Sequence, residues 1–321
     1  MLSYRHAFHA GNAQDVIKHA VLAFCLDYLG RKEKPCLLVD THAGAGAYAL
    51  NQGYAAQSGE WKGGIGKLLA LGEGLPALAE AYLGLAGFLG PDWRPVPEGA
   101  GAEKPGNPRG RAKLPEASAI QAYPGSPALM AKSLRPGDRL VCFEKHPEDY
   151  LSLRRLLEGV PGAEARREDG FKGLRSLLPP PSRRALVLID PSYELKEDYR
   201  ILPAVLEDAL GRFPAGTCLV WYPLLGAYRA SEEMPGRLMQ LYRGNRCRLE
   251  LYTSPDKRPR EGSPRGMYGS GMVIYNPPWT LRTALETGLP AFAAALGAGP
   301  RAWMLQWEEA PRNPGSGKGS I

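Results

Sequence analysis

Two short stretches of this chain combine an apolar run with residues that could do chemistry. In the first, LLVD at residues 37–40 is followed by the turn THAGAG at residues 41–46. In the second, ALVLID at residues 185–190 is followed by Pro191-Ser192-Tyr193. Each apolar run is typical of a buried parallel strand, and each ends in an acidic residue. Because open α/β sheets bind ligands outside the carboxyl ends of their strands, both turns are predicted to lie at a binding cleft.

The second turn places a carboxylate, a carbonyl and an aromatic ring on neighbouring residues. It resembles the Asp-Pro-Pro-Tyr signature of methyltransferases that modify exocyclic amino groups of nucleobases. The amino nitrogen of adenine is a poor nucleophile, so an enzyme must supply acceptors for its hydrogens. We expect Asp190 and the Pro191 carbonyl to be these acceptors, and Tyr193 to bind substrate by stacking on an extruded base. Ser192 stands where the signature has its second proline. The alternative to a catalytic turn is an Asp-Pro turn that only caps a helix.

The first turn and two later strand ends indicate a nucleoside ligand. Glycines at Gly44 and Gly46 permit a tight turn and a close approach of the backbone to a ligand. A dinucleotide-binding fold needs an acid about 20 residues further on, whereas the next strand here ends only at Glu144. Glu144 is expected to accept hydrogen bonds from ribose hydroxyls, and Asp169-Gly170 ends the third strand. These acids at successive strand ends favour an adenosine ligand. For the glycine turn itself, the alternative is a loop that only joins a strand to a helix and binds no ligand.

Histidines gather at the start of the chain. Four of the five lie within the first 42 residues, at His6, His9, His19 and His42. No pattern of standard metal-ligand spacing accompanies them, so we expect no metal. Binding of substrate or cofactor explains them better. Tyr4 and His6 can fold over a base from a leading segment, while Lys18 and His19 face the same cleft from a helix. For Lys18 alone, a solvated surface lysine is the alternative.

The elements that must position these residues follow a βαβ rhythm. Helical spacing predicts a helix over residues 15–29, ahead of the first strand. Further strands are predicted over residues 139–144, 164–167, 185–190, 217–222, 247–253 and 271–275. Helices predicted over residues 147–157, 170–178 and 199–212 separate most of them, which indicates a doubly wound sheet. No helix is predicted between the last two strands, which indicates a β-hairpin. A basic, Pro/Gly-rich loop joins its two strands.

One interval is too long for a single crossover connection. Between the first strand and residue 139, helical patterns cover residues 61–71 and 75–89, and a Pro/Gly-rich, charged segment follows them. We therefore expect a main domain over residues 1–50 and 123–308. An inserted helical subdomain with its loop would cover residues 51–122, and a flexible tail would cover residues 309–321.

Composition limits the class of protein. The chain has 321 residues, 44% of them hydrophobic, which excludes wholesale disorder and suffices for a large core. Lys and Arg exceed Asp and Glu by 40 to 33, and this excess suits a polyanionic partner such as nucleic acid. The five cysteines have no Cys-x-x-Cys spacing and indicate free thiols of a reducing compartment. No apolar stretch has the length that a membrane helix needs. We expect a soluble, cytoplasmic monomer.

The motifs taken together resemble one family. They are the N-terminal MLSYRHAFHAGNAQDVIKH, then VDTHAGAG, YPGSP at residues 123–127, EKHP at 144–147, EDGF at 168–171 and IDPSYE at 189–194. This set closely resembles the ribosomal RNA large subunit methyltransferase J family, which methylates the exocyclic amino group of one adenine in 23S rRNA. The resemblance covers nearly the whole chain, except residues 90–118 and the tail after Trp307.

The resemblance implies a fold, a cofactor and a site. The fold is α/β, a Rossmann-like class I S-adenosylmethionine-dependent methyltransferase sheet ending in a β-hairpin, with an inserted small helical subdomain. The partner is 23S rRNA, protein-free or in an early assembly intermediate, methylated on N6 of adenine 2030. The implied cofactor contacts are His19, His42, Ser126, Glu144, Asp169 and Gly170. Asp190 would be the catalytic acceptor, and Tyr4, His6 and Lys18 would engage the target adenine.

Three alternatives remain open. A DNA adenine methyltransferase would share the loop at Asp190, which contacts only the flipped base. A non-catalytic RNA-binding assembly factor could keep the cofactor-binding fold without its activity, and Ser192 would then be a sign that catalysis has been lost. The intact Asp190, Tyr193 and Glu144 argue against decay. A phosphate-binding or NAD-dependent enzyme is a distant third. The chain lacks the lysine that follows the glycines of a phosphate-binding loop, and it lacks the acid that a dinucleotide-binding fold needs about 20 residues after its glycines.

Overall fold

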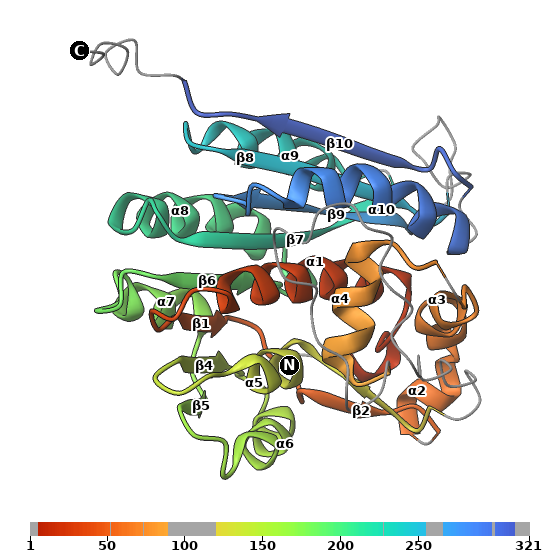
Figure 1. Cartoon of the computed structure of the whole chain (residues 1–321), viewed down its shortest axis with the longest axis horizontal. Coiled ribbons are helices and arrows are strands. Elements are labelled where there is room, and N and C mark those ends of the chain that lie inside the picture. The colour runs from red at the N-terminus through yellow and green to blue at the C-terminus, as the bar shows by residue number, and fades with distance from the viewer. Residues whose placement is uncertain are drawn as a thin grey trace.

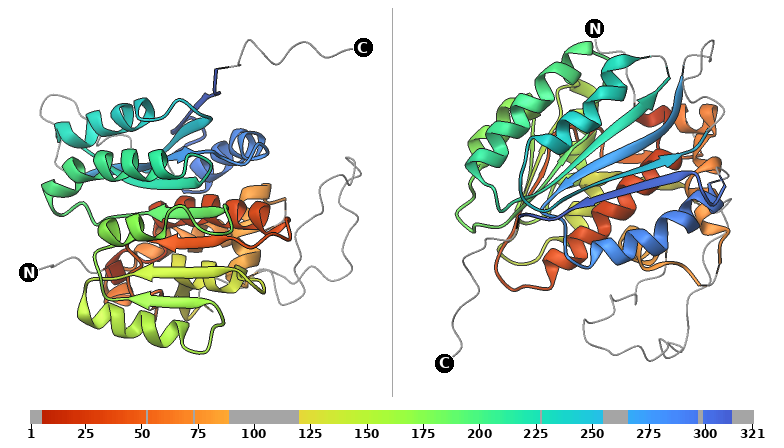
Figure 2. Two further views of the ribbon diagram at one scale, coloured as in Figure 1. Left: turned by 90° about the vertical axis from the view of Figure 1, so that its left-hand side faces the viewer. Right: turned by 90° about the horizontal axis from the view of Figure 1, so that it is seen from above.

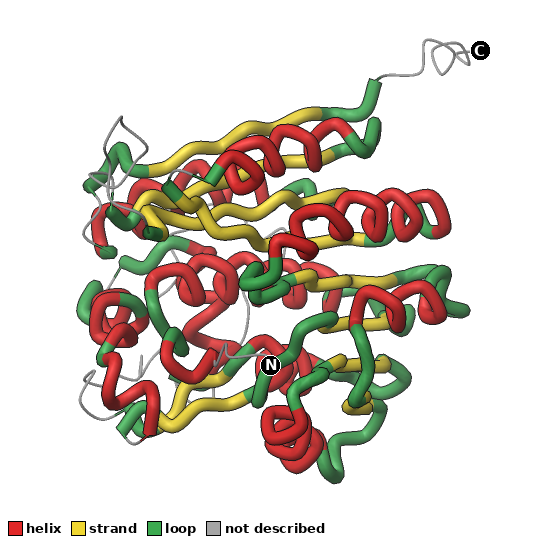
Figure 3. Tube along the Cα trace, turned by 180° about the vertical axis from the view of Figure 1, so that it is seen from behind, coloured by secondary structure: helices red, strands yellow, loops and turns green. Residues whose placement is uncertain are grey.

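The fold is a twisted sheet with helices on both faces. The structure is a computed structural model, and it describes residues 6–51, 53–72, 74–88, 120–226, 228–254, 266–296 and 299–311. Eight strands form the main sheet in the order β10-β8-β9-β7-β6-β1-β4-β5. Figure 1 and Figure 2 show helices α1, α4 and α10 on one face and α7, α8 and α9 on the other. Figure 3, drawn from behind, shows the second helical layer in front of the strands.

Five parallel strands form the half of the sheet that carries the predicted chemistry. They are β1 (Leu37–Asp40), β4 (Arg139–Phe143), β5 (Ala163–Arg166), β6 (Ala185–Ile189) and β7 (Thr217–Leu225). Strand β1 lies centrally between β4 and β6, so their carboxyl ends meet at one edge of the sheet. Every residue of β1 and β6 is buried, as expected for strands covered on both faces. The predicted Rossmann-like arrangement is confirmed.

The other half of the sheet is antiparallel. Strands β8 (Arg246–Tyr252) and β9 (Met267–Tyr275) form the predicted hairpin, with β9 placed between β7 and β8. Strand β10 (Trp303–Glu308), which the sequence pattern did not predict, pairs with the outer side of β8. This edge strand has no fully buried residue, so its sequence carries little of the hydrophobic signal that marks a core strand.

Helices connect the strands. Helix α1 (Ala13–Gly30) is capped by Asn12, whose side chain accepts hydrogen bonds from the amides of Gln14 and Asp15. The remaining connecting helices are α5 (Ser126–Ser133), α6 (Pro147–Leu157), α7 (Gly170–Leu177), α8 (Lys196–Arg212), α9 (Arg229–Gln240) and α10 (Leu281–Ala295). A short 3-10 helix, η1 (His6–Phe8), precedes α1. Among the described helices, none is long and apolar enough to cross a membrane.

The segment between β1 and β4 contains more than helices. It comprises β2 (Ala47–Ala49), α2 (Gly53–Ser58), η2 (Glu60–Gly63), α3 (Ile65–Leu69), α4 (Ala77–Ala86) and β3 (Ala122–Pro124). Strands β2 and β3 pair with each other as a separate antiparallel ribbon. The helix predicted over residues 61–71 is interrupted at Gly64, where a side chain would collide with the Gly11 carbonyl. The Pro/Gly-rich segment at residues 90–118 and the tail from residue 312 lie outside the described residues.

Close packing at Gly170 makes a stability prediction. A Cβ on Gly170 would collide with the Thr41 carbonyl, so α7 must shift away from the β1 turn if the residue is larger. We expect Gly170→Ala to lower the free energy of unfolding by about 1–3 kcal/mol, measured by urea denaturation. Gly211→Ala in α8 is the matched control, because open space surrounds that position. It should instead raise stability by about 0.5–1 kcal/mol. Equal stability of the two variants would contradict the packing argument.

Candidate active site

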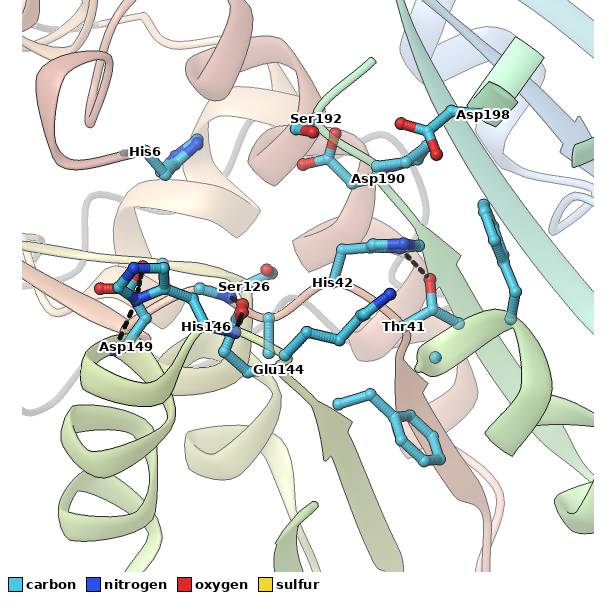
Figure 4. A pocket seen from close by; sticks show the side chains of 18 of the residues that line it. His6, Thr41, His42, Ser126, Glu144, His146, Asp149, Asp190, Ser192 and Asp198 are labelled. Atoms are coloured by element: carbon cyan, nitrogen blue, oxygen red, sulfur yellow. Dashed lines mark hydrogen bonds and ion pairs between the residues drawn. The ribbon is translucent and has the colours of Figure 1, made fainter. Parts of the chain in front are cut away.

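A cleft opens where the carboxyl ends of β1, β4 and β6 meet. It collects nine of the eleven residues that the sequence analysis assigned to a site: His6, Lys18, His19, His42, Ser126, Glu144, Asp169, Gly170 and Asp190. Figure 4 shows His42 between Asp190 on one side and Glu144 on the other. Tyr4 lies outside the described residues, and Tyr193 is not among the residues that line the cleft. Strand-end position brings five of these nine together, whereas the other four come from η1, α1 and the start of α5.

The glycine turn after β1 is tied to the end of β4. Gly44 and Gly46 adopt positive φ angles of 60° and 80°, a backbone conformation that favours glycine. The amide of Gly44 donates to Glu144 Oε2 at 2.8 Å, and the amide of His146 donates to Oε1 at 2.6 Å. Burial raises the pKa of Glu144, and these two amides oppose that effect. Each carboxylate oxygen keeps a further lone pair with which it can accept a ligand hydroxyl.

Asp40 is a buried acid at the base of the turn. Its side chain is inaccessible, and Oδ2 has no hydrogen-bond partner among the described residues. Burial raises the pKa of Asp40 to about 6, although the Ser126 hydroxyl and the His42 amide oppose the shift. A buried polar atom without a partner is uncommon and points to a group that a ligand or water satisfies. Asp40 was recognised as a strand-end acid but not assigned to the site.

His42 is held as a neutral ring with a defined orientation. The Thr41 hydroxyl donates to the Leu188 carbonyl at 3.1 Å, so its oxygen accepts from His42 Nδ1, 2.8 Å away. Burial lowers the pKa of His42 to about 4. The ring of Phe171 packs edge-on against it, with 4.7 Å between centroids. His42 Nε2 is therefore left as a hydrogen-bond acceptor.

The turn after β5 is fixed by capping. Asp169 Oδ1 accepts from the amides of Phe171 and Lys172 at the start of α7. Its other oxygen, Oδ2, pairs with Lys145 Nζ at 3.1 Å. Burial alone would raise the pKa of Asp169, but Lys145 and the two amides lower it. The carboxylate is thus charged and preorganised at one end of the cleft. Lys145 was missed, because a lone lysine after a strand carries no specific signal.

At the other side of the cleft, Asp190 is paired with Lys18. Lys18 Nζ donates to Asp190 Oδ2 at 2.6 Å and also lies 2.8 Å from Asp15 Oδ1. The Lys18 side chain is 4% exposed, so the surface alternative for this residue is wrong. Burial alone would lower the pKa of Lys18, but the charges of Asp15 and Asp190 raise it above its ordinary value. Lys18 therefore remains an ammonium ion against the predicted catalytic carboxylate.

Tyr193 is placed behind the cleft. Its side chain is buried, and its hydroxyl donates to the Trp221 carbonyl at 2.6 Å. Its ring packs on Tyr199, with 4.8 Å between centroids. The residue has a positive φ of 56°, which a non-glycine residue adopts only when its surroundings hold it there. In this structure Tyr193 anchors the turn that follows Asp190, and its stacking on a base stays a prediction.

His19 belongs to a buried hydrogen-bonded chain. The Tyr82 hydroxyl of α4 lies 2.9 Å from the Tyr123 hydroxyl of β3, which lies 2.8 Å from His19 Nδ1. If Tyr82 donates to Tyr123 and Tyr123 donates to His19, then His19 Nε2 carries the proton. Burial lowers the pKa of His19 to about 3, and the charge of Lys18 adds to that effect. His19 is thus a neutral ring whose Nδ1 is occupied by Tyr123.

This buried histidine gives a pH prediction. Unfolded His19 titrates near 6.5, whereas the folded ring stays neutral down to about 3. The unfolded chain therefore binds the extra proton below pH 6.5, and the stability contributed by neutral His19 is lost as pH falls. The slope from one such group is about 1.4 kcal/mol per pH unit. We expect His19→Gln to lose less stability than the wild type between pH 6.5 and 4.5 in urea denaturation. Parallel curves would contradict the assignment.

Further residues near the site were missed. Leu195 and Asp198 follow the Asp190 turn and line the cleft. Asp15 does not line the cleft, but it supports Lys18 from the first turn of α1. The spacing of Asp15 and Lys18, three residues apart on a helix, was the signal available for that pair. The described residues hold no group of three or more His, Cys, Asp or Glu side chains arranged to bind a metal.

A family model, two relatives and one solved structure each match most of this chain. The family model described as ribosomal RNA large subunit methyltransferase D, RlmJ, matches residues 33–92 and 112–309. The ribosomal RNA large subunit methyltransferase J of Haemophilus influenzae is 36% identical over 308 residues, 96% of this chain and 99% of the relative. Its namesake from Escherichia coli is 37% identical over 290 residues, 90% of this chain and 92% of the relative. The crystal structure of a Legionella pneumophila protein superposes with a TM-score of 0.76 at 30% identity, covering 95% and 99% of the two chains.

Proposed function

Because this chain belongs to the ribosomal RNA large subunit methyltransferase family RlmJ, we propose that it transfers a methyl group from S-adenosylmethionine to an adenine of 23S rRNA. The acceptor atom in this proposal is the exocyclic nitrogen N6, and the target is adenine 2030. The observation that carries the proposal is the position of Asp190. Its carboxylate lies at the end of β6, in the same cleft as the glycine turn and Glu144.

The residues of the cleft fit S-adenosylmethionine. The glycine turn after β1 has no side chain at Gly44, where a Cβ would collide with the Tyr48 hydroxyl. Asp40, whose Oδ2 has no hydrogen-bond partner among the described residues, ends the strand that leads into this turn. We assign the ribose hydroxyls to Glu144 and the adenine end to Asp169 and Gly170. His19, His42 and Ser126 would hold the amino-acid end. When bound, S-adenosylmethionine supplies an electrophilic methyl group.

Asp190 would act on the acceptor nitrogen. Its carboxylate and the Pro191 carbonyl accept the amino hydrogens and favour a pyramidal, more nucleophilic nitrogen. The proton released by the reaction passes to Asp190 or to water. Ser192 supplies an amide N–H that the usual second proline lacks, but it leaves both acceptors in place.

Target binding would fall to the N-terminal segment and helix α1. His6 lines the cleft and is 20% exposed, and its ring lies 5.2 Å from that of Tyr48. In the proposal His6, Lys18, Tyr4 and Tyr193 engage the flipped adenine. A net charge of +7 favours an RNA partner. The substrate would be protein-free RNA or an early assembly intermediate, bound by a cytoplasmic monomer.

The experiment compares three acceptors. Purified protein is incubated with methyl-labelled S-adenosylmethionine and protein-free 23S rRNA, assembled large subunits or duplex DNA. The proposal expects label on protein-free 23S rRNA and little on the other two. Label on duplex DNA alone would establish a DNA methyltransferase instead. No label on any acceptor, despite measurable cofactor binding, would favour an assembly factor.

A further inference from the structure

The Lys18 ammonium is shared between two carboxylates. Its nitrogen lies 2.6 Å from Asp190 Oδ2 and 2.8 Å from Asp15 Oδ1. The Trp221 ring faces it on a further side, with the ring centroid 5.8 Å away. All of these groups surround a side chain that is 4% exposed. An ammonium has three N–H donors, and two of them are committed to different carboxylates.

Asp15 is itself rigidly held. Its other oxygen, Oδ2, accepts from the Gly11 amide at 3.0 Å and lies 3.0 Å from His6 Nε2. Its backbone amide donates to the Asn12 cap of α1, and its side chain is 3% exposed. The position of Asp15 Oδ1, and with it one side of the Lys18 ammonium, is therefore fixed by the start of helix α1.

This arrangement leaves one oxygen of Asp190 available. Among the described residues the structure records a partner for Asp190 Oδ2 but none for Oδ1. We propose that Asp15 is a positioning residue, which holds the Lys18 ammonium on a single oxygen of Asp190 and so keeps Oδ1 open for the target amino group. This inference rests on the proposed function, because it assigns Oδ1 to the acceptor nitrogen.

The physical reason is competition for the ammonium. Without the Asp15 carboxylate, Lys18 is free to turn two N–H groups toward Asp190 and to engage both of its oxygens. The whole positive charge would then neutralise one carboxylate instead of being divided between two. Asp190 would become a weaker and less accessible acceptor. The loss would fall on the chemical step, because Asp190 acts on the acceptor nitrogen and Asp15 itself lines no part of the cleft.

A double-mutant cycle tests this coupling. The variants are Asp15→Asn, Lys18→Met and the pair together, and the readouts are kcat and KM for protein-free 23S rRNA. We expect Asp15→Asn to lower kcat by about tenfold with little change in KM. In the Lys18→Met background the same substitution should change kcat by less than about twofold. An equal loss in both backgrounds, or a wild-type kcat for Asp15→Asn, would overturn the proposal.

A matched control lies on the same helix. Asp27 pairs with Arg31 near the end of α1, at 2.8 Å. Asp27→Asn removes the same charge from the same helix and should leave kcat unchanged. Thermal unfolding and cofactor affinity are measured for all variants, so that a folding defect is separated from a catalytic one.

A second variant covers the case in which Asp15→Asn does not fold. Lys18→Arg keeps the positive charge but presents a planar fork that matches both carboxylate oxygens. The proposal expects a kcat loss of about tenfold or more. A wild-type kcat for folded Lys18→Arg would overturn it, since occupation of Oδ1 would then not matter. If the wild type itself methylates no RNA, the proposed function fails; an active wild type with an additive cycle defeats only this inference.

Discussion

Replacement of Asp190 by alanine is expected to reduce methyl transfer by about 10²–10³-fold, the usual effect of removing one preorganised polar group from a reacting centre. The side chain lies in the cleft, with one oxygen on Lys18 and the other facing no described partner. Cofactor affinity should stay within about twofold of the wild type, because the assigned cofactor residues are elsewhere. Single-turnover kinetics and calorimetric cofactor binding together measure the two effects.

Two controls sharpen this prediction. Asp190→Asn keeps one acceptor oxygen but adds N–H donors facing Lys18, so we expect it to be nearly as inactive as the alanine variant. Asp208→Ala removes an acid from α8 that is 41% exposed and paired with Arg212; its activity should be that of the wild type. Loss of cofactor binding in Asp190→Ala, equal to its loss of activity, would contradict the assignment of Asp190 to the acceptor.

Replacement of Glu144 by alanine is expected to weaken cofactor binding by about 1–3 kcal/mol, or roughly 5–150-fold in Kd. Two effects combine. The amides of Gly44 and His146 lose their carboxylate partner, so the glycine turn is less well ordered before the cofactor binds. The ribose hydroxyls also lose their acceptor. Titration calorimetry with S-adenosylmethionine measures the change.

Glu164 on the neighbouring strand β5 provides the matched control. Its carboxylate is 46% exposed and pairs with Arg166, and it does not line the cleft. Glu164→Ala should bind the cofactor as the wild type does. Glu144→Gln should fall between the wild type and Glu144→Ala, because the amide oxygen still accepts from one partner. An unchanged Kd in Glu144→Ala would exclude Glu144 from the cofactor site.

The central sheet could be predicted because each of its strands is marked by a short pattern of neighbouring residues in the sequence. Strands β1 and β6 are short apolar runs that end in an acid, and βαβ connections bring such ends to one edge of a sheet. This rule alone predicts that Asp190, Glu144 and Asp169 lie at one cleft.

What could not be predicted depends on contacts between distant segments. The β2–β3 ribbon pairs Tyr48 with Tyr123, across a long insertion, and neither strand has more than three residues. At the break after Gly64, the Ile65 amide donates to the Gly11 carbonyl at 2.9 Å, a distant partner that no helical pattern contains. Tyr193 matched an aromatic motif position, yet its burial and its bond to the Trp221 carbonyl depend on a neighbouring strand.

The Lys18 environment illustrates the same limit. A single lysine on a helix is a surface residue in most proteins, and only the fold brings Asp190 to it across 172 positions of sequence. Asp15, by contrast, is three residues from Lys18 and was available to a helical-spacing argument.

The most direct test of the account is the chemical identity and position of the methylated nucleoside. Protein-free 23S rRNA is methylated with wild-type protein, digested to nucleosides and analysed by mass spectrometry, with fragment mapping to locate the modification. The account predicts N6-methyladenosine at a single position of the RNA, absent from the Asp190→Ala reaction. A methyl group on a ribose oxygen, a ring carbon or a ring nitrogen would contradict the role of Asp190 as acceptor for an exocyclic amino group, and a methyl group on the amino nitrogen of another base would contradict adenine as the target.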